Sequence, residues 1–351
     1  MSKTQAKVAV IGHFAFGKEY LDGQTVKTKI VTEELSRQFG NEEVIKIDTH
    51  GGKITALKAP FQVLKALKKS KNAVIFPAHN GLRVYAPLLV FFKKFFKKRK
   101  LHYVVIGGWL PKFLQNKKGL AKRLKTFDGI YVETNTLKTA LENQGFKNVF
   151  VMPNCKDLKV LKAEELIYPI GEPYKLCTFS RVMKEKGIED AVNAVKTVNE
   201  MIGRNVYTLD IYGQVDSAQT QWFEDLKKNF PEYIKYCGTV DYDKSVGVLK
   251  NYSALLFPTR FYTEGIPGTI IDAYAAGVPV IASKWESFSD IIEDFSSGIC
   301  YEFGDSADLC RCLDVMVNNP GTICGMKANC LKKSIEYLPV KAVRVLTENL
   351  A

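Results

Sequence analysis

The chain has 351 residues, of which 46% are hydrophobic and 25% charged, and a formal net charge of +13, so it is a globular protein long enough for two domains. No run of about 18 apolar residues is present, which excludes a transmembrane helix, and the first residues lead directly to a strand-like run at Val8–Ile11, so no signal peptide is expected. The eight cysteines form no CxxC pair and the four histidines form no metal-binding pattern, so reduced thiols and no metal or cofactor are expected.

In the first half of the chain, apolar runs of strand length alternate with amphipathic segments of helix length. Such alternation predicts a parallel sheet that is covered by helices. We predict strands at residues 8–11, 44–47, 73–76, 102–106, 129–132 and 149–152, and helices at 25–39, 61–70, 83–99, 117–125 and 135–144.

Several loops that follow these strands carry polar or aromatic residues. The first loop lacks the GxGxxG spacing of a dinucleotide site, so it is either a loop whose amides meet a phosphate or a plain turn between strand and helix. The loop after the third strand adds polar groups, including His79, which either contacts a ligand or caps the strand end. The loop after the fourth strand adds an aromatic side chain, Trp109, that can stack on a sugar. The candidates at this edge are His13, Gly23, Gln24, His79, Asn80 and Trp109.

The positive charge is concentrated between Asp48 and Asp128, where 19 Lys and Arg residues and no acidic residue occur. On a helical wheel, the run 91–98 places four Phe on one half and four Lys on the other. The Phe face is expected to pack on the sheet, while the Lys face is either simply solvated or attracted to anionic lipid. The candidates for a membrane surface are Phe91, Phe92, Lys93, Lys94, Lys97, Lys98 and Arg99.

Proline, glycine and charged residues then interrupt the pattern, which predicts a first domain at 1–155 and a linker at 156–173. A second domain is predicted at 174–335, and residues 336–351 are expected to form a helix that packs back toward the first domain. The strands of the second domain are predicted at 174–179, 207–212, 233–237, 254–257, 278–282 and 298–301, and its helices at 187–202, 218–229, 267–276 and 306–318. The fold class is therefore α/β with two Rossmann-like domains, and a ligand cleft is expected between them, beyond the carboxyl ends of the strands.

Two cations follow the first strand of the second half. Arg181 and Lys186 lie between this strand and the next helix, where a guanidinium and an ammonium can clamp a diphosphate. A solvated helix start is the alternative. After the next two strands come Gly213 and, further on, Thr239 and Val240, where glycine either admits a flat base or forms a tight turn.

The segment from Glu264 to Asp272 combines two carboxylates, a Gly-Ile-Pro turn and a helix start. Proline suits the first helical position, and the unpaired amides there favour a phosphate. Because eight positions make about two helical turns, both carboxylates are expected on the same side. The residues expected to contact a sugar phosphate are Thr263, Glu264, Gly265, Ile266, Pro267, Thr269 and Asp272.

Together these motifs resemble those of the retaining nucleotide-sugar glycosyltransferases of family four, whose GT-B architecture has two Rossmann-like domains facing each other across a cleft. The similarity is specific over about residues 174–320, and relatives from bacterial capsule and exopolysaccharide clusters are the most similar. It implies that Arg181 and Lys186 hold the donor diphosphate and that Glu264 meets the donor sugar. The resemblance also assigns the ribose to the second acidic residue, and UDP is the commonest donor nucleotide of the family. It rests on Ser180-Arg181…Lys186-Gly187, Tyr212-Gly213, Thr263–Pro267 and Asp272–Ala282.

The sequence departs from the family pattern in two places. Asp272 stands where glutamate is usual, so its ribose contact is either direct, mediated by water or shifted. In addition, the strand end at Gly107-Gly108-Trp109 lacks a histidine that the family often has there. The role of that histidine is unfilled unless His13 or His79 takes its place. The resemblance implies that the first domain lies on the acceptor side, and it makes Gly23 and Gln24 candidates for donor binding and His13, His79, Asn80 and Trp109 candidates on the acceptor side.

The resemblance implies front-side substitution in which the leaving diphosphate takes the acceptor proton. We expect a metal-independent hexosyltransferase that uses a nucleotide-sugar donor and an acceptor saccharide on polyprenyl diphosphate, in the cytoplasm at the inner face of the cell membrane. One alternative is a nucleotide-sugar epimerase of the same architecture, whose motif set is not found here. A nucleic-acid-binding protein is the alternative of a different class, suggested by the pI of about 9.2, but the sequence has no recognition motif for it.

Overall fold

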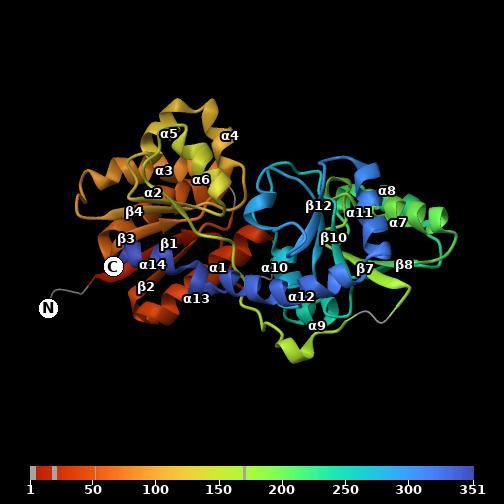
Figure 1. The fold of residues 1–351 in the computed structure, drawn as a ribbon. Helices are drawn as coiled ribbons and strands as arrows, with labels where there is room; N and C mark the ends of the chain where they lie inside the picture. The colour runs from red at the N-terminus through yellow and green to blue at the C-terminus, as the bar shows by residue number, and fades with distance from the viewer. Residues whose placement is uncertain (1–4, 18–21, 52, 169–170) are drawn as a thin grey trace. The chain divides into compact units, whose positions relative to one another are not determined.

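The computed structural model describes residues 5–17, 22–51, 53–168 and 171–351, with the side chains of 53–56 left out. The chain divides into two compact units: the first contains Met1–Asp157 and Tyr337–Ala351, and the second contains Leu158–Glu336 (Figure 1). Residues 1–4 of the predicted first domain and residues 169–170 of the predicted linker lie outside the described residues.

The first unit is built on a six-stranded parallel sheet in the order β2-β1-β3-β4-β5-β6. Helices α2, α3 and α5 cover one face, and α1 and two C-terminal helices cover the other (Figure 1). Covered on both faces, the central strands are apolar runs without alternation. The strands are β1 (Ala6–Gly12), β2 (Val44–Asp48), β3 (Ser70–Ile75), β4 (Lys100–Val104), β5 (Gly129–Val132) and β6 (Val149–Val151), and the helices are α1 (Gly23–Phe39), α2 (Lys53–Lys69), α3 (His79–Lys93), α4 (Leu110–Gln115), α5 (Lys118–Leu124), α6 (Asn135–Glu142), α13 (Pro339–Ala342) and α14 (Arg344–Leu350).

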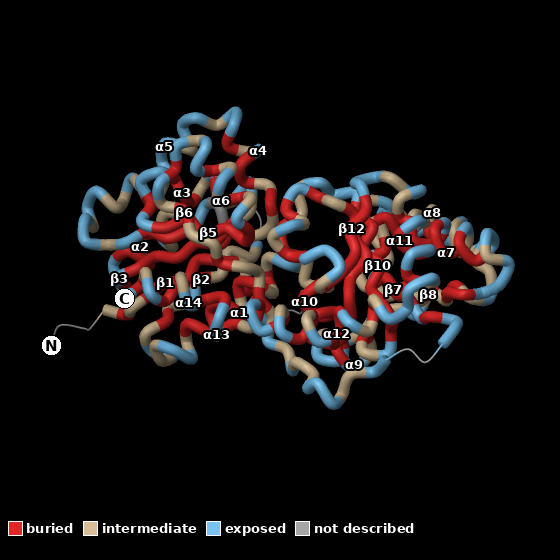
Figure 2. Tube along the Cα trace, viewed as in Figure 1, coloured by how far each residue is buried: buried red, intermediate tan, exposed pale blue. Residues whose placement is uncertain are grey.

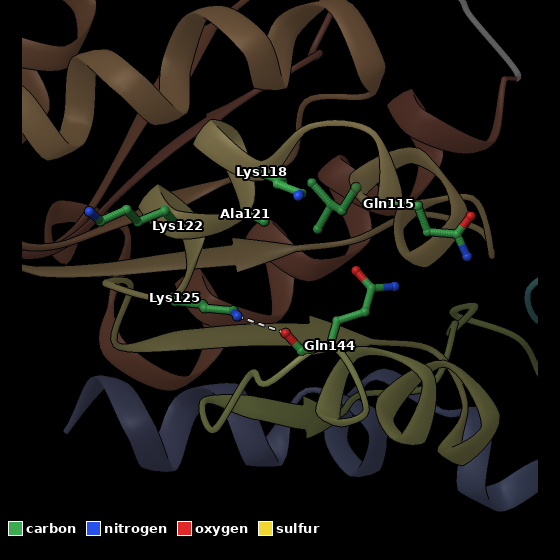
Figure 3. A pocket seen from close by; sticks show the side chains of 7 residues that line it. Gln115, Lys118, Ala121, Lys122, Lys125 and Gln144 are labelled. Atoms are coloured by element: carbon green, nitrogen blue, oxygen red, sulfur yellow. Dashed lines mark hydrogen bonds between the residues drawn. The ribbon is translucent and has the colours of Figure 1, made fainter.

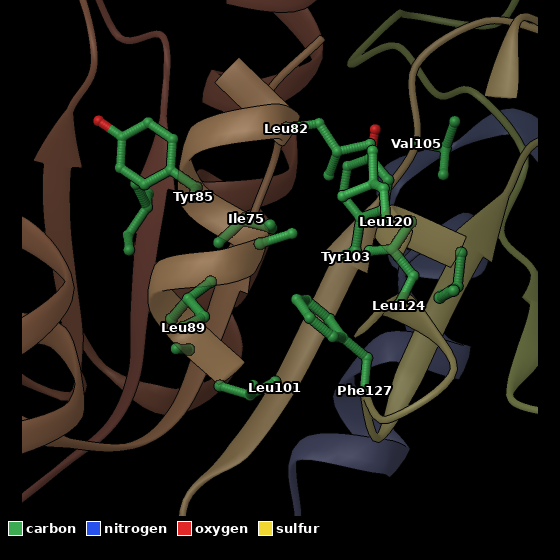
Figure 4. Close-up of a cluster of buried hydrophobic side chains, with 14 of the residues drawn as sticks. Ile75, Leu82, Tyr85, Leu89, Leu101, Tyr103, Val105, Leu120, Leu124 and Phe127 are labelled. Atoms are coloured by element: carbon green, nitrogen blue, oxygen red, sulfur yellow. The ribbon is translucent and has the colours of Figure 1, made fainter. Parts of the chain in front are cut away.

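The core of this unit lies between the sheet and the helices α2, α3 and α5, and is fully buried (Figures 2 and 4). Leu82 and Leu89 of α3 and Leu120 and Leu124 of α5 belong to one cluster with Tyr103 of β4. Their spacing of seven positions in α3 and four in α5 puts the apolar residues of each helix on one face. This packing fixes the starts of α3 and α4 at the carboxyl edge of the sheet.

The C-terminal segment belongs to the first unit although the second unit precedes it in the chain. Leu346 and Leu350 of α14 are buried. The side-chain amide of Asn72 in β3 donates to the carbonyl of Leu350 at 3.1 Å, and Lys100 Nζ donates to that of Asn349 at 3.4 Å. The end of the chain therefore contributes helices that pack on the sheet of the first unit.

The second unit contains another six-stranded parallel sheet, in the order β12-β11-β10-β7-β8-β9. Helices α7, α8 and α11 lie on one face, and α9, α10 and α12 lie on the other (Figure 1). The elements are β7 (Tyr174–Phe179), α7 (Ile188–Ile202), β8 (Tyr207–Tyr212), α8 (Thr220–Lys227), β9 (Ile234–Gly238), α9 (Ser245–Leu249), β10 (Ala254–Phe257), α10 (Gly268–Ala275), β11 (Val280–Ser283), β12 (Gly298–Tyr301), α11 (Ser306–Asn318) and α12 (Gly321–Ser334).

The predicted fold class is confirmed, and every predicted strand is present with small shifts at its ends. The helix predicted at 83–99 is wrong at both ends, because α3 begins at His79 and ends at Lys93. After Lys93 the amides of residues 94–96 bond to carbonyls three positions back, so the helix gives way to turns that lead into β4. No described helix combines the length and the apolar character needed to cross a bilayer.

Candidate active site

The sheet of the second unit has a switch point between its two central strands, β7 and β10. From β7 the strand order continues to β8 and β9 on one side, and from β10 to β11 and β12 on the other. Loops that leave two such strands run apart, and open α/β sheets bind ligands in the crevice between them. Residues 180–187 follow β7 and residues 258–267 follow β10, so both predicted groups lie at this crevice.

Gly187 allows these two loops to approach each other. Its φ is +68°, and a Cβ there would lie 1.8 Å from the carbonyl oxygen of Pro258. Only a residue without a side chain fits this position. The neighbouring Lys186 is thereby held against the end of β10.

Lys186 and Glu264 form an ion pair at this crevice. The ammonium donates to Oε1 of Glu264, which also accepts a hydrogen bond from Thr259 Oγ1 at 3.2 Å. The Lys186 and Glu264 side chains are 19% and 16% exposed, and Nζ lies 5.6 and 5.0 Å from the ring centroids of Phe257 and Phe261. A charge in such a partly desolvated place interacts more strongly than at an open surface. The pair remains reachable, which suits a site where a diphosphate meets the ammonium.

Arg181 lies on the same loop but has a different carboxylate partner. Its side chain is 57% exposed, and Nη1 lies 3.6 Å from Oδ2 of Asp216. An exposed guanidinium with one long ion pair can turn toward a phosphate at little cost. Among the residues that the structure describes, no three His, Cys, Asp or Glu side chains gather to hold a metal ion.

The segment after Glu264 differs from the prediction, because Glu264 is not part of a helix. Helix α10 begins at Gly268, and Pro267, with φ −66° and ψ 129°, is the residue before it rather than its first. The helical arithmetic that placed Glu264 and Asp272 on one side does not hold. Asp272 is 3% exposed within α10, whereas Glu264 stays partly exposed at the crevice.

The start of α10 offers hydrogen-bond donors. Gly265 and Ile266 are buried in the turn, and Thr263 is partly exposed. No side chain caps the helix, and the buried hydroxyl of Thr269 has no hydrogen-bond partner among the described residues. The amides of the first helical residues and this hydroxyl are the groups that a phosphate at a helix start would use.

Sequence reasoning missed the residues that hold the Lys186 loop. Arg260 binds Asp190 at two points, 2.6 and 2.7 Å, and its backbone amide donates to the carbonyl of Glu185 at 2.9 Å. The side chain of Gln219 bonds to the amide of Lys184 and to the carboxylate of Glu185, both at 2.8 Å. These partners are 34 to 75 positions apart, the longest separation being that of Arg260 and Glu185, and no local motif links them.

Gly213 is required by the packing of the strand ends. Its φ is +136°, and a Cβ would lie 1.8 Å from the carbonyl oxygen of Ser180. Its amide donates to the carbonyl of Gly238 at 2.8 Å. Thr239 is exposed and Val240 half-buried just after β9, two strands away from β7. The close approach seen at Gly213 is made by the protein's own backbone.

In the first unit, a hydrogen-bonded chain joins Asp22, Thr25, His13 and His50. Thr25 Oγ1 donates to Asp22 at 2.6 Å and lies 2.6 Å from His13 Nδ1, while His13 Nε2 lies 3.0 Å from His50 Nδ1. Burial opposes ionisation of Asp22, but hydrogen bonds from Thr25, the nearby His13 and the amide of Gln24 hold its pKa below the usual range. His13 thus belongs to a network at the start of α1.

Gly23 and Gln24 form the first turn of α1, which Asp22 caps through two backbone amides. Gly23 is exposed, and the side-chain amide of Gln24 donates to the carbonyl of Phe76, just beyond β3, at 3.4 Å. Both therefore lie at the switch point of the first sheet, where β1 adjoins β3.

His79 is the first residue of α3 and not a strand end, as β3 already ends at Ile75. Its ring centroid lies 3.8 Å from that of Trp109, whose indole N–H donates to the carbonyl of Ile106 at 2.8 Å. Asn80 beside it is exposed. The structure therefore brings His79 and Trp109 together and leaves His13 in a separate network.

The helical wheel predicted for residues 91–98 does not hold, because α3 ends at Lys93. Phe92 and Phe96 pack partly buried against the core, but Phe91 is 52% and Phe95 71% exposed, with ring centroids 5.9 Å apart. Two phenyl rings thus face solvent, contrary to the expectation that the aromatic face is packed on the sheet.

The basic residues of this segment differ in their surroundings. Lys93 pairs with Asp128 at 2.7 Å, and Arg99 Nε donates to the carbonyl of Leu67 at 2.8 Å. The remaining lysines of the same short segment are exposed; they are Lys94, Lys97 and Lys98.

A separate cavity of about 460 Å³ lies between α4, α5 and the turn after α6 (Figure 3). Lys125 Nζ crosses part of it to donate to the carbonyl of Gln144 at 2.7 Å. None of the predicted site residues lines this cavity. Its lining is Leu114, Gln115, Lys118, Ala121, Lys122, Lys125 and Gln144.

Comparison with known proteins shows what the second unit is similar to. Residues 173–319 match the family described as glycosyl transferases group 1. The chain is 24% identical over 253 residues to an uncharacterized glycosyltransferase of Methanocaldococcus jannaschii, covering 66% of this chain and 62% of that one. It is also 24% identical over 148 residues to the amylovoran biosynthesis glycosyltransferase AmsK of Erwinia amylovora, covering 41% and 36%. The chain thus spans less than two thirds of these relatives.

The fold is that of GT-B glycosyltransferases. The crystal structure of HepE from Anabaena in complex with UDP superposes with a TM-score of 0.73 at 14% identity, covering 98% of this chain and 99% of that one. At this identity the likeness concerns the fold alone.

Proposed function

We propose, from the premise that residues 173–319 are a domain of the group 1 glycosyl transferases, that this protein transfers a hexose from a nucleotide sugar to a saccharide acceptor in the synthesis of a cell-surface polysaccharide. The observation that carries the proposal is the ion pair of Lys186 and Glu264 at the switch point between β7 and β10. It joins a cation for the donor diphosphate to a carboxylate for the donor sugar. UDP is the proposed nucleotide, supported by the UDP complex of HepE.

The proposed reaction is a metal-independent substitution with retention of configuration. The bond between the anomeric carbon and the diphosphate oxygen breaks, the acceptor oxygen bonds to the same face of that carbon, and the acceptor proton passes to the departing diphosphate. Lys186 and Arg181 stabilise the negative charge that develops on the diphosphate. Glu264 accepts hydrogen bonds from the sugar hydroxyls, and the amides at the start of α10 bind a phosphate oxygen.

A binding and product analysis tests this function. UDP is expected to raise the melting temperature of the protein, since a ligand that binds only the folded state stabilises it. Incubation with a panel of UDP-sugars and a saccharide acceptor should then yield a product whose new glycosidic bond has the anomeric configuration of the donor, measured by NMR. Absence of any shift with UDP, GDP and ADP would contradict the proposal, and an inverted product would contradict its mechanism.

We also propose that the acceptor is carried on a lipid, as a saccharide on polyprenyl diphosphate, and that the protein binds the inner membrane face peripherally through its first unit. Support comes from the exposed rings of Phe91 and Phe95 amid exposed lysines, because apolar rings and ammonium groups together suit an anionic lipid surface. The relative AmsK is named for the biosynthesis of a polysaccharide, amylovoran.

A further inference from the structure

Three aromatic rings form a cluster at the carboxyl edge of the first sheet. His79 opens α3, Trp109 precedes α4 and Phe113 lies within α4. The centroid of His79 lies 3.8 Å from that of Trp109 and 4.9 Å from that of Phe113, and the Trp109 and Phe113 centroids are 5.0 Å apart. The His79 side chain is exposed and the other two rings are half-buried. The cluster is therefore a fixed aromatic surface that a ligand can reach.

Two cations flank this surface. The Arg83 guanidinium carbon lies 5.2 Å and the Lys117 ammonium 4.2 Å from the centroid of Phe113. Arg83 follows His79 by one helical turn, so both side chains lie on the same face of α3. Within the described ranges neither cation forms an ion pair, and no acidic residue occurs in the sequence between Asp48 and Asp128.

The cations act on the histidine directly. Contact with Trp109 and Phe113 partly buries the His79 ring and lowers its pKa below the usual range, and the charges of Arg83 and Lys117 lower it further. The imidazole is therefore neutral at neutral pH and can donate or accept a hydrogen bond. The positive electrostatic potential from Arg83 and Lys117 thus extends to His79, and a bound anion would offset it.

We propose that the cluster of His79, Arg83, Trp109, Phe113 and Lys117 binds a sugar phosphate group of the acceptor. This inference rests on the proposed function, since it names the part of the acceptor that the first unit recognises. The guanidinium and the ammonium bind the phosphate oxygens, one by a two-point contact and the other as a point charge. The flat indole and imidazole cover the apolar face of the adjoining sugar ring.

Two kinds of ligand carry such a sugar phosphate group: an acceptor on a lipid diphosphate and a soluble sugar phosphate. The test compares three probes by isothermal titration calorimetry: a hexose 1-phosphate, a short prenyl-diphosphate-linked hexose, and the methyl glycoside of the same hexose. All measurements use the Arg181→Ala/Lys186→Ala background, so that the cations of the second unit do not contribute. Binding here thus does not depend on the donor site, which the UDP experiment tests in the unsubstituted protein.

The test variant is Arg83→Gln/Lys117→Gln, and the matched control is Lys112→Gln/Lys122→Gln, which removes two exposed lysines outside the cluster. We expect at least one phosphorylated probe to bind, at least about 10-fold more weakly to the test variant and unchanged in the control, because a charge-assisted hydrogen bond contributes about 1.5 to 3 kcal/mol. Weakening of both probes identifies the phosphate as the recognised group, and weakening of the prenyl probe alone identifies the lipid-linked source.

Equal binding of the phosphorylated probes to the test and control variants would overturn the proposal, as would equal binding of the methyl glycoside and the phosphorylated probes to the unsubstituted cluster. Failure of every phosphorylated probe to bind would overturn it too. NMR titration gives a second readout: a bound phosphate should raise the pKa of His79, because it offsets the field of the two cations. Circular dichroism confirms that each variant is folded.

Discussion

Lys186, which follows β7 by a short loop, is held at the crevice by contacts on several sides. Its ammonium donates to Glu264 and lies over the rings of Phe257 and Phe261. Lys184, two positions earlier, is exposed and lies over the ring of Trp222, 5.7 Å from its centroid. The two lysines share one turn of chain but differ in their surroundings. They therefore offer a matched pair of substitutions.

We expect Lys186→Met to lower kcat for glycosyl transfer by about 100-fold or more, because it removes a donor that stabilises charge in the transition state. Lys184→Met should leave kcat within about twofold, as expected for an exposed side chain outside the site. Steady-state kinetics at saturating donor measure both. Full activity of Lys186→Met under these conditions would remove this lysine from the mechanism.

Gly187 supports the same site through its backbone. An alanine there must adopt a φ of +68° and also places its Cβ 1.8 Å from the Pro258 carbonyl oxygen. Gly203, at the other end of α7, has a φ of +77° but no atom within 4 Å of its ideal Cβ. Gly203→Ala should therefore lower the free energy of unfolding only by the cost of a left-handed alanine, about 1 to 2 kcal/mol.

Gly187→Ala should lower the melting temperature clearly more than Gly203→Ala, since the steric clash adds to the same backbone cost. Thermal unfolding followed by circular dichroism measures the difference. The variant should also lose UDP binding, because the displaced loop carries Lys186. Equal melting temperatures for the two variants would contradict this, because the loops after β7 and β10 would then move apart without a loss of stability.

At the scale of elements, two of the aromatic residues around the end of α3 face solvent. Phe91 is exposed within the last turn of α3, and Phe95 is exposed in the turns that follow Lys93. The double variant Phe91→Ser/Phe95→Ser should reduce sedimentation with anionic liposomes at least about fivefold, because the two rings supply the apolar part of the binding.

Met201→Ser is the matched control, since Met201 is 73% exposed on α7 of the second unit. It should sediment like the unsubstituted protein. Liposomes of neutral lipid should bind less of every form, as the lysine contribution depends on anionic lipid. Equal and negligible sedimentation with both kinds of liposome would refute the membrane proposal.

The elements were largely predictable from sequence, because their periodic apolar patterns reflect local geometry. The strands at Tyr174–Phe179 and Gly129–Val132 have the predicted bounds, since each is a short buried run. The pairing of Arg260 with Asp190 was not predictable, as two charged side chains 70 positions apart carry no sign of their contact. The start of α3 at His79 was missed for a similar reason: its neighbour Trp109 comes from another loop.

At the scale of the whole molecule, one buried histidine makes stability depend on pH. His102 in β4 is 1% exposed and lies 3.1 Å from the hydroxyl of Tyr131. Its pKa is lowered from 6.5 to about 4, mainly by burial; Asp128 opposes this shift, and Lys100 and Lys93 contribute to it. Between pH 6.5 and 4 the unfolded chain binds the proton more tightly, so the free energy of unfolding decreases as the pH falls.

Between pH 7 and pH 5 this histidine should remove about 2 kcal/mol of stability, and the loss should be complete below pH 4. Urea unfolding at both pH values measures the change. In His102→Gln the side chain does not titrate, so the difference between the two pH values should be smaller by about that amount. An identical pH dependence of variant and unsubstituted protein would show that another group is responsible.

The return of the C-terminal segment to the first unit has a consequence for biosynthesis. Asn72 bonds to Leu350, 278 positions later, and Leu346 and Leu350 are buried in the first unit. On the ribosome, residues 1–157 therefore emerge long before the helices that complete them, while the whole second unit is translated in between. The second unit can fold as a continuous stretch during this interval. One face of the first unit's sheet therefore lacks its C-terminal helices, and leaves apolar surface exposed, until the whole chain has been translated.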